Sequence, residues 1–199
     1  MPVENKVICA KFGKIAKILE RLEIIATKEL LDAPVLFTGP TGSGKEMLAD
    51  YLVEHIPEDT QKDPPYEKIN CIGLSKDMIE SELFGHKKGA FTGALNEHTG
   101  LIESSENGIL FLDEIGALSE PLQEKFLRVL EDRKIRKVGG SESEKMHVRF
   151  IAATTENRPL LPDLKHRFSY KIEVPPLKEN SEEIPYLHLG DRLDCSHHY

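Results

Sequence analysis

Short apolar runs alternate along the chain with longer segments whose apolar residues recur every three or four positions. The apolar runs predict buried strands over residues 34–38, 67–71, 108–115, 148–154 and 170–174. The helical spacing predicts helices over residues 11–31, 45–55, 76–83, 120–131 and 160–168. Strands that alternate with helices in this way predict an α/β fold of three layers, with a mainly parallel central sheet.

Three stretches fall outside this alternation. Residues 1–10 are expected to be a loose lead-in, and residues 57–66 are a polar, proline-rich surface connection. Residues 85–94 are rich in glycine and have no periodicity.

A length of 199 residues, with 39% hydrophobic and 30% charged residues, suits one globular domain or one domain with a fragment of a second. No apolar run is long enough to cross a bilayer and the N-terminus has no apolar signal-peptide core, so we expect a cytoplasmic chain with no membrane partner. The net charge of −8 argues against electrostatic binding of nucleic acid by the whole chain. Cys9, Cys71 and Cys195 are far apart, which favours reduced thiols over a disulfide framework or a metal site.

A glycine-rich turn follows the strand predicted at residues 34–38, and a helix follows the turn at once. Its spacing is that of a phosphate-binding P-loop, in which backbone N–H groups and a helix N-terminus surround an anion and a lysine pairs with the terminal phosphates. An ordinary turn before a helix is the alternative, and the complete order of strand, loop, lysine and helix argues against it. The residues of the loop are Gly39, Pro40, Thr41, Gly42, Ser43, Gly44, Lys45 and Glu46, and the last of them stands where P-loops normally carry Ser or Thr.

Polar side chains lie at the ends of three of the apolar runs. Ligands of open α/β sheets bind at the carboxyl ends of the strands. Asp113 there suits Mg²⁺, and Glu114 is placed to activate a water for attack on a γ-phosphate. Asn70 could hydrogen-bond Glu114 or could equally satisfy a loop backbone. Thr154 and Thr155 end another run and could sense the γ-phosphate, a weak signal by itself.

Three motifs stand in the chain in a characteristic order: residues 39–46, Glu82-Leu-Phe-Gly-His-Lys-Lys-Gly-Ala-Phe-Thr-Gly-Ala94 and Gly108-Ile-Leu-Phe-Leu-Asp-Glu-Ile115. Together they resemble the AAA+ domain of bacterial enhancer-binding proteins, the ATPases that activate sigma-54 RNA polymerase. The resemblance covers about residues 11–187, and residues 127–131 and 138–140 also fit it. Its most specific part is the complete hexapeptide Gly89, Ala90, Phe91, Thr92, Gly93 and Ala94.

The resemblance implies a role for each matched residue. Residues 39–46 would bind ATP, with Lys45 on the phosphates, and the family commonly has Glu at the position of Glu46. Asp113 would hold Mg²⁺ and Glu114 would polarise water, while Asn70 matches the asparagine that switches the catalytic glutamate. Residues 89–94 would form the tip of a loop that rises when ATP is bound and touches sigma-54.

The chain departs from the family at two positions near its end. The family usually carries two arginines in the segment that here reads Leu160-Leu-Pro-Asp-Leu-Lys-His-Arg167. Arg167 matches the second arginine, but Leu161 stands at the place of the first. Either family arginine could act on the ATP of a neighbouring subunit, so Arg167 is one candidate for this role and Arg158 is another. Thr155 stands where the family usually has asparagine.

The predicted organisation is an ATPase subdomain over residues 11–175, followed by a helical lid that residues 176–199 only begin. We expect ATP and Mg²⁺ as cofactors, sigma-54 RNA polymerase as the partner, a homo-oligomeric ring that is hexameric, and no direct specific DNA binding. The leading interpretation is an ATPase that remodels the polymerase to activate transcription. The alternatives are a catalytically weak nucleotide-binding module, which Leu161 and the short lid favour, and a P-loop ATPase that remodels another partner.

Overall fold

The computed structural model describes residues 6–8, 13–27, 33–57, 64–176 and 187–189. The chain divides into two compact units, which are taken in turn. The larger comprises Leu31–Thr38 and Glu58–Ile172, and the smaller comprises Met1–Leu30, Gly39–Pro57 and Glu173–Tyr199.

The larger unit is built on a five-stranded sheet with the order β3-β4-β7-β2-β8. Its strands are β2 (Val35–Thr38), β3 (Tyr66–Asn70), β4 (Ile109–Asp113), β7 (Arg149–Thr154) and β8 (Tyr170–Glu173). β3, β4, β7 and β2 run parallel, so their carboxyl ends share one edge of the sheet. The register places Asn70 opposite Asp113 and Thr38 opposite Thr154 at that edge. The predicted α/β fold with a parallel sheet is therefore confirmed.

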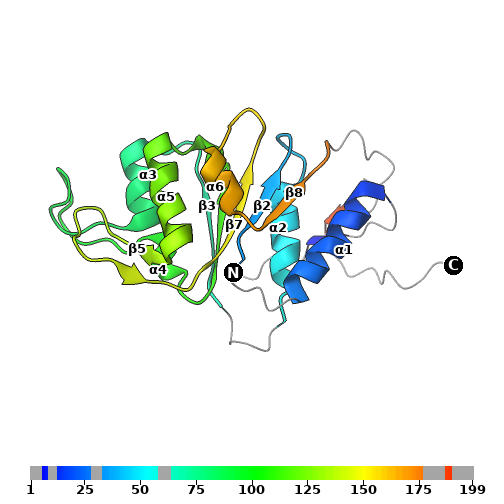
Figure 1. The fold of residues 1–199 in the computed structure, drawn as a ribbon, viewed down its shortest axis with the longest axis horizontal. Helices are drawn as coiled ribbons and strands as arrows, with labels where there is room; N and C mark the ends of the chain where they lie inside the picture. Colours follow the sequence, from blue (N-terminus) through cyan, green and yellow to red (C-terminus); the bar gives the residue numbers. More distant parts are fainter. Residues whose placement is uncertain (1–5, 9–12, 28–32, 58–63, 177–186, 190–199) are drawn as a thin grey trace. The chain divides into compact units, whose positions relative to one another are not determined.

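Helices α3 (Lys76–Phe84), α5 (Glu120–Asp132) and α6 (Pro162–Arg167) share one hydrophobic core with one face of this sheet (Figure 1). Phe126 of α5 and Phe150 of β7 lie at its centre, both fully buried, with ring centroids 5.1 Å apart in an edge-to-face arrangement. The unit also contains α4 (Leu101–Ser104), the 3-10 helix η2 (Ile115–Ala117) and the antiparallel pair β5 (Lys134–Ile135) and β6 (Glu144–Lys145).

The smaller unit contains α1 (Gly13–Thr27), α2 (Lys45–Glu54) and an antiparallel pair of strands, β1 (Lys6–Ile8) and β9 (Leu187–Leu189). The phenol of Tyr51 on α2 donates a 2.6 Å hydrogen bond to Glu23 on α1. Burial and this carboxylate raise the pKa of Tyr51.

Most predicted elements are present, with ends that differ by one or a few residues. The predicted strand over 108–115 is too long, because the strand ends at Asp113 and Glu114 turns into η2 with a φ of 52°. β1 lies within the predicted lead-in over residues 1–10 and β9 within the predicted lid and tail over residues 176–199, and the two strands pair with each other. The parts of these predictions on residues 1–5, 9–12, 28–32, 58–63, 177–186 and 190–199 lie outside the described residues. Among the described helices, none combines the length and the apolar character needed to cross a membrane.

Candidate functional site

The predicted P-loop follows β2 directly and leads into α2 at Lys45. Gly42 and Gly44 have φ angles of 75° and 86°, which other residues rarely adopt. Gly39 has no room for a side chain, because a Cβ there would lie 2.3 Å from the carbonyl oxygen of Val174. The backbone of this loop therefore depends on its glycines, as an anion-binding nest does.

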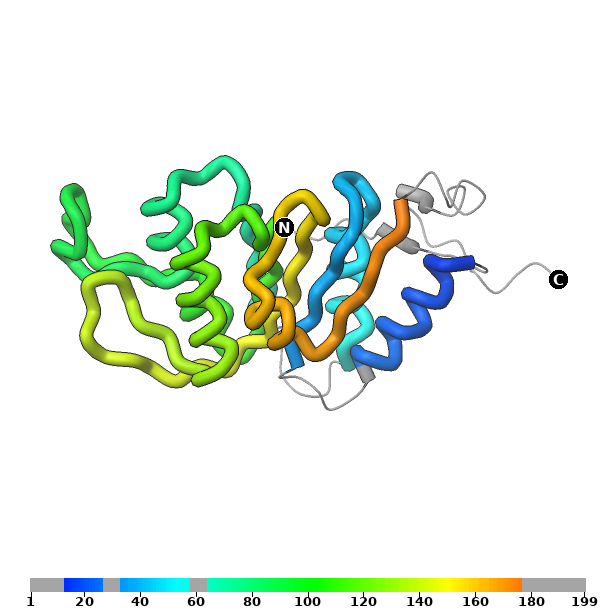
Figure 2. Tube along the Cα trace, turned by 45° about the horizontal axis from the view of Figure 1, so that its top comes forward, coloured from blue at the N-terminus to red at the C-terminus, as the bar shows by residue number. Residues whose placement is uncertain are grey.

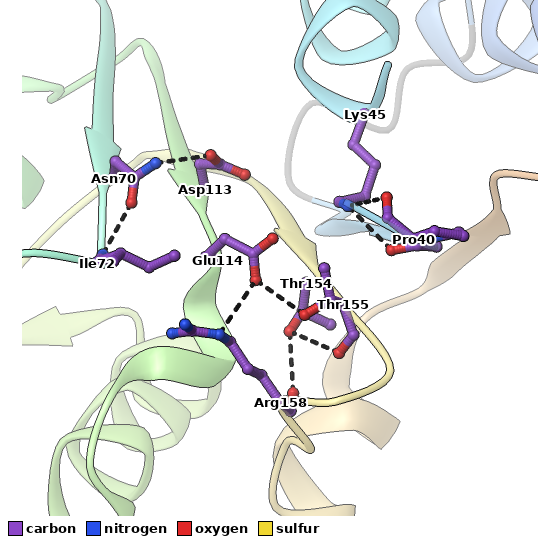
Figure 3. Close-up of polar contacts among 10 residues, drawn as sticks. Pro40, Lys45, Asn70, Ile72, Asp113, Glu114, Thr154, Thr155 and Arg158 are labelled. Atoms are coloured by element: carbon purple, nitrogen blue, oxygen red, sulfur yellow. Dashed lines mark hydrogen bonds and ion pairs between the residues drawn. The ribbon is translucent and has the colours of Figure 1, made fainter. Parts of the chain in front are cut away.

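Two side chains of the P-loop are buried and polar. The ammonium group of Lys45 donates to the carbonyl oxygens of Gly39 and Pro40, at 2.9 Å in each case (Figure 3). The hydroxyl of Ser43 is buried and has no hydrogen-bond partner among the described residues. Because a buried hydroxyl without a partner costs free energy, this loop fits a ligand that brings hydrogen-bond acceptors, such as a phosphate group.

Asn70 and Asp113 lie side by side at the ends of β3 and β4. The side-chain amide of Asn70 donates a 2.9 Å hydrogen bond to Asp113 Oδ2, and its oxygen accepts one of 2.8 Å from the backbone N–H of Ile72 (Figure 3). Of the two alternatives for Asn70, the hydrogen bond to a loop backbone is present, whereas its amide donates to Asp113 and not to Glu114. The parallel register explains the difference, because it sets Asn70 directly opposite Asp113.

Glu114 is nine-tenths buried and adopts a left-handed backbone conformation immediately after β4. Its Oε2 accepts a 3.2 Å hydrogen bond from the hydroxyl of Thr155 and lies 3.9 Å from Nε of Arg158 (Figure 3). Thr154, which was predicted to sense the γ-phosphate, forms no hydrogen bond with this carboxylate in the described part of the chain. Its hydroxyl donates instead to the carbonyl oxygen of Arg158, at 3.0 Å.

Cys71 follows Asn70 and is buried beside the two carboxylates. Burial raises the pKa of its thiol to about 12, and the negative charges of Asp113 and Glu114 act in the same direction. The sequence predicted only a reduced thiol here. Its position directly after a strand-ending asparagine is the one signal that places it near the carboxylates.

The hexapeptide Gly89–Ala94 forms the tip of a loop that extends from the larger unit beside residues 136–146 (Figures 1 and 2). Hydrogen bonds from Gly89 N to Ala94 O and from Ala94 N to Phe91 O close the tip, at 2.8 and 3.0 Å. Phe91 remains 43% exposed. Its ring packs against the ring of His86 in an edge-on arrangement, with the ring centroids 4.9 Å apart. The hexapeptide thus presents an aromatic ring to solvent at the tip of a polar loop.

The base of this loop is held by charged residues that no motif of the sequence includes. Glu97 pairs with Lys87 at 2.8 Å and with Lys137 at 2.9 Å, and Lys137 also pairs with Glu103 at 2.9 Å. The two hydrogen bonds from Lys87 and Lys137 lower the pKa of Glu97 to about 2. The charges of Lys87, Glu97, Glu103 and Lys137 are a faint signal in the sequence, because their contacts join segments that are far apart in the chain.

The two candidate arginines have partners within the larger unit. Arg167 donates to Glu131 through Nε at 2.9 Å, and half of its side chain stays exposed. Arg158 faces Glu114, as described above. Leu161 packs against the hydrophobic core, and its backbone N–H donates to the buried side chain of Gln123 at 2.9 Å. In this chain the residue at position 161 therefore packs against the core.

The chain resembles a family of known domains over most of its length. Residues 8–176 match the model of the sigma-54 interaction domain. The chain is 44% identical over 178 residues to the DNA-binding transcriptional activator HyfR of Escherichia coli. This match covers 85% of the chain and 26% of HyfR. The chain is 46% identical over 163 residues to the Nif-specific regulatory protein of Herbaspirillum seropedicae, covering 77% of the chain and 29% of that protein.

Among solved structures, NtrX from Brucella abortus in complex with ADP superposes with a TM-score of 0.75 at 27% identity. The match covers 90% of this chain and 39% of the NtrX chain. The chain thus spans about a quarter to two-fifths of the length of these proteins.

Proposed function

The chain belongs to the sigma-54 interaction domain family, and from this membership we propose that it hydrolyses ATP to remodel sigma-54 RNA polymerase and activate transcription. The relatives described above are transcriptional regulators, and the fold is that of an AAA+ domain. The observation that carries the polymerase part of the proposal is the exposed Phe91 on a loop with the complete family hexapeptide.

The nucleotide part rests on the P-loop and on the carboxylates after β4. Lys45 and the residues 39–46 would bind the phosphates, and the hydroxyl of Ser43, which finds no hydrogen-bond partner in the described part of the chain, supports this role. The carboxylate of Asp113, held by Asn70, would hold Mg²⁺, which prefers oxygen ligands. When bound, Mg²⁺ neutralises negative charge on the phosphate oxygens. Glu114 would accept a hydrogen bond from the attacking water, and Thr154 would support the nucleotide site from the end of β7.

We expect the active form to be a homo-oligomeric ring, a hexamer, in the cytoplasm. In such a ring Arg167 or Arg158 of one subunit would act on the ATP of the next, and an arginine finger is worth on the order of 10³–10⁵ in rate. The contact between Arg167 and Glu131 would then open on assembly, which is inexpensive because the pair is exposed.

The loop assignment is tested by binding of purified sigma-54 in the presence of a transition-state analogue of ATP. Phe91→Ala and Thr92→Ala should lose this binding while ATP turnover persists. Leu95→Ala is the matched control, since Leu95 is a still more exposed apolar residue just outside the hexapeptide. Normal sigma-54 binding by both hexapeptide variants would refute the assignment.

A second candidate function is a nucleotide-binding module with weak turnover. Leu161 favours it, because a core-packed leucine occupies the place of a family arginine. Leu161→Arg should then raise ATP turnover, with Leu161→Met as the control for packing. An unchanged rate in Leu161→Arg, beside an already high rate in the wild type, would exclude this candidate.

A further inference from the structure

The proposed base Glu114 is held by residues other than the asparagine expected to hold it. Thr155 donates a hydrogen bond of 3.2 Å to Glu114 Oε2, and Nε of Arg158 lies 3.9 Å from the same oxygen. Asn70 is directed to Asp113. All of these contacts lie within the larger unit, at the exits of β3, β4 and β7.

The turn after β7 places Thr155 and Arg158 beside this carboxylate. The backbone N–H of Arg158 donates to the carbonyl oxygen of Thr155 at 3.1 Å, and the hydroxyl of Thr154 donates to the carbonyl oxygen of Arg158 at 3.0 Å. Gly116 of η2 lies against the turn, since a Cβ there would come within 2.1 Å of the same carbonyl oxygen. The contacts to Glu114 therefore belong to a closely packed backbone arrangement and not to a single side-chain rotamer.

We propose that Thr155 and Arg158 restrain Glu114 in the resting state, and that their release precedes ATP hydrolysis. The proposal rests on the proposed function, since it assigns Glu114 the role of accepting a hydrogen bond from the attacking water. A carboxylate oxygen that already accepts a hydrogen bond and faces a guanidinium is a weaker acceptor for water. Thr155 and Arg158 are thus positioning residues, and Asn70 in this chain positions Asp113.

The test compares Thr155→Val, which removes the hydroxyl at nearly constant volume, with Thr155→Ser, which keeps a donor. Turnover is measured at saturating ATP, and nucleotide affinity is measured separately with a fluorescent ATP analogue. We expect Thr155→Val to raise kcat roughly three- to tenfold, the range that corresponds to one net hydrogen bond of ordinary strength. The affinity of Thr155→Val for the nucleotide should equal that of the wild type, and Thr155→Ser should keep the wild-type kcat.

Two further variants separate this restraint from a general structural role. The proposal leaves the role of arginine finger to Arg167, so Arg158→Gln should also raise kcat, and a lower kcat would overturn the part of the proposal that concerns Arg158. Thr155→Val combined with Glu114→Gln should show no gain over Glu114→Gln alone, because the restraint acts only through the carboxylate. A gain in the double variant would overturn the proposal.

The same variants distinguish an error in the restraint of Glu114 from an error in the proposed ATPase function. If Glu114→Gln abolishes turnover while Thr155→Val and Thr155→Ser both keep the wild-type kcat, the restraint is wrong and the ATPase assignment stands. If Glu114→Gln keeps full turnover, the role of Glu114 is wrong. The wild-type chain could also show no turnover. In that case, turnover gained by Thr155→Val would support the restraint, and no gain in Thr155→Val would overturn the restraint.

Discussion

Gly116→Ala is a direct test of how closely η2 and the turn after β7 pack. The added Cβ would lie 2.1 Å from the carbonyl oxygen of Arg158 and 2.6 Å from the hydroxyl of Thr154. An ordinary C···O contact is about 3.3 Å or longer, so the oxygen of Arg158 would have to move by about 1 Å. That movement would stretch the 3.0 Å hydrogen bond between Thr154 and Arg158.

The expected cost follows from overpacking a site whose neighbour is backbone. Such insertions typically cost about 1–3 kcal/mol, and in a chain of this size each kcal/mol lowers Tm by about 2–4 °C. We therefore expect Gly116→Ala to lower the Tm by roughly 2–12 °C in thermal unfolding followed by circular dichroism.

Gly140→Ala is the matched control for Gly116→Ala. Its nearest contact would be 3.2 Å, to the carbonyl oxygen of Lys137, and Gly140 has no positive φ. A smaller effect is expected there. A Tm of Gly116→Ala equal to that of the wild type would refute the argument, because it would mean that the turn yields at no cost and does not hold Thr155 and Arg158 in place.

Two further predictions follow from shifted pKa values. Because the pKa of Cys71 rises from 9.0 to about 12 on folding, its thiol should stay protonated and resist iodoacetamide at pH 9 in the native protein, as read by site-resolved mass spectrometry. Its contribution to stability is complete below pH 9 and falls as the pH rises toward 12, since only the unfolded thiol then ionises; rapid native alkylation of Cys71 would contradict this. Because the pKa of Glu97 falls from 4.5 to about 2, its contacts with Lys87 and Lys137 should persist above pH 4.5 and be lost as the pH falls toward 2. Glu97→Gln should therefore speed hydrogen exchange in residues 86–98 at pH 7, whereas Glu142→Gln should not; equal exchange in Glu97→Gln and the wild type would contradict the role of these ion pairs.

The sequence predicts the large elements of this fold because their signals are local. Runs such as Ile109–Asp113 are apolar throughout, as a strand buried on both faces must be. The glycine–lysine spacing of the P-loop likewise lies within one short segment. The pair β1 and β9 has no such signal, since each strand has three residues and about 180 residues separate them.

The partners of Glu114 were beyond prediction for a related reason. They depend on the sheet order, which sets β7 beside β4 and brings Thr155 to the carboxylate. Asn70, on the other side of β4, was the more obvious partner by type of side chain. Its register opposite Asp113 decided which carboxylate it binds, and a single sequence does not contain that register.

The most direct test of the account is ATP hydrolysis per subunit as a function of protein concentration, with Glu114→Ala as the blank. If the chain is an ATPase completed by the arginines of neighbouring subunits, the rate per subunit will climb steeply as the concentration rises and the blank will stay flat. A rate that stays at the level of the blank at every concentration, while nucleotide still binds, would contradict the central claim.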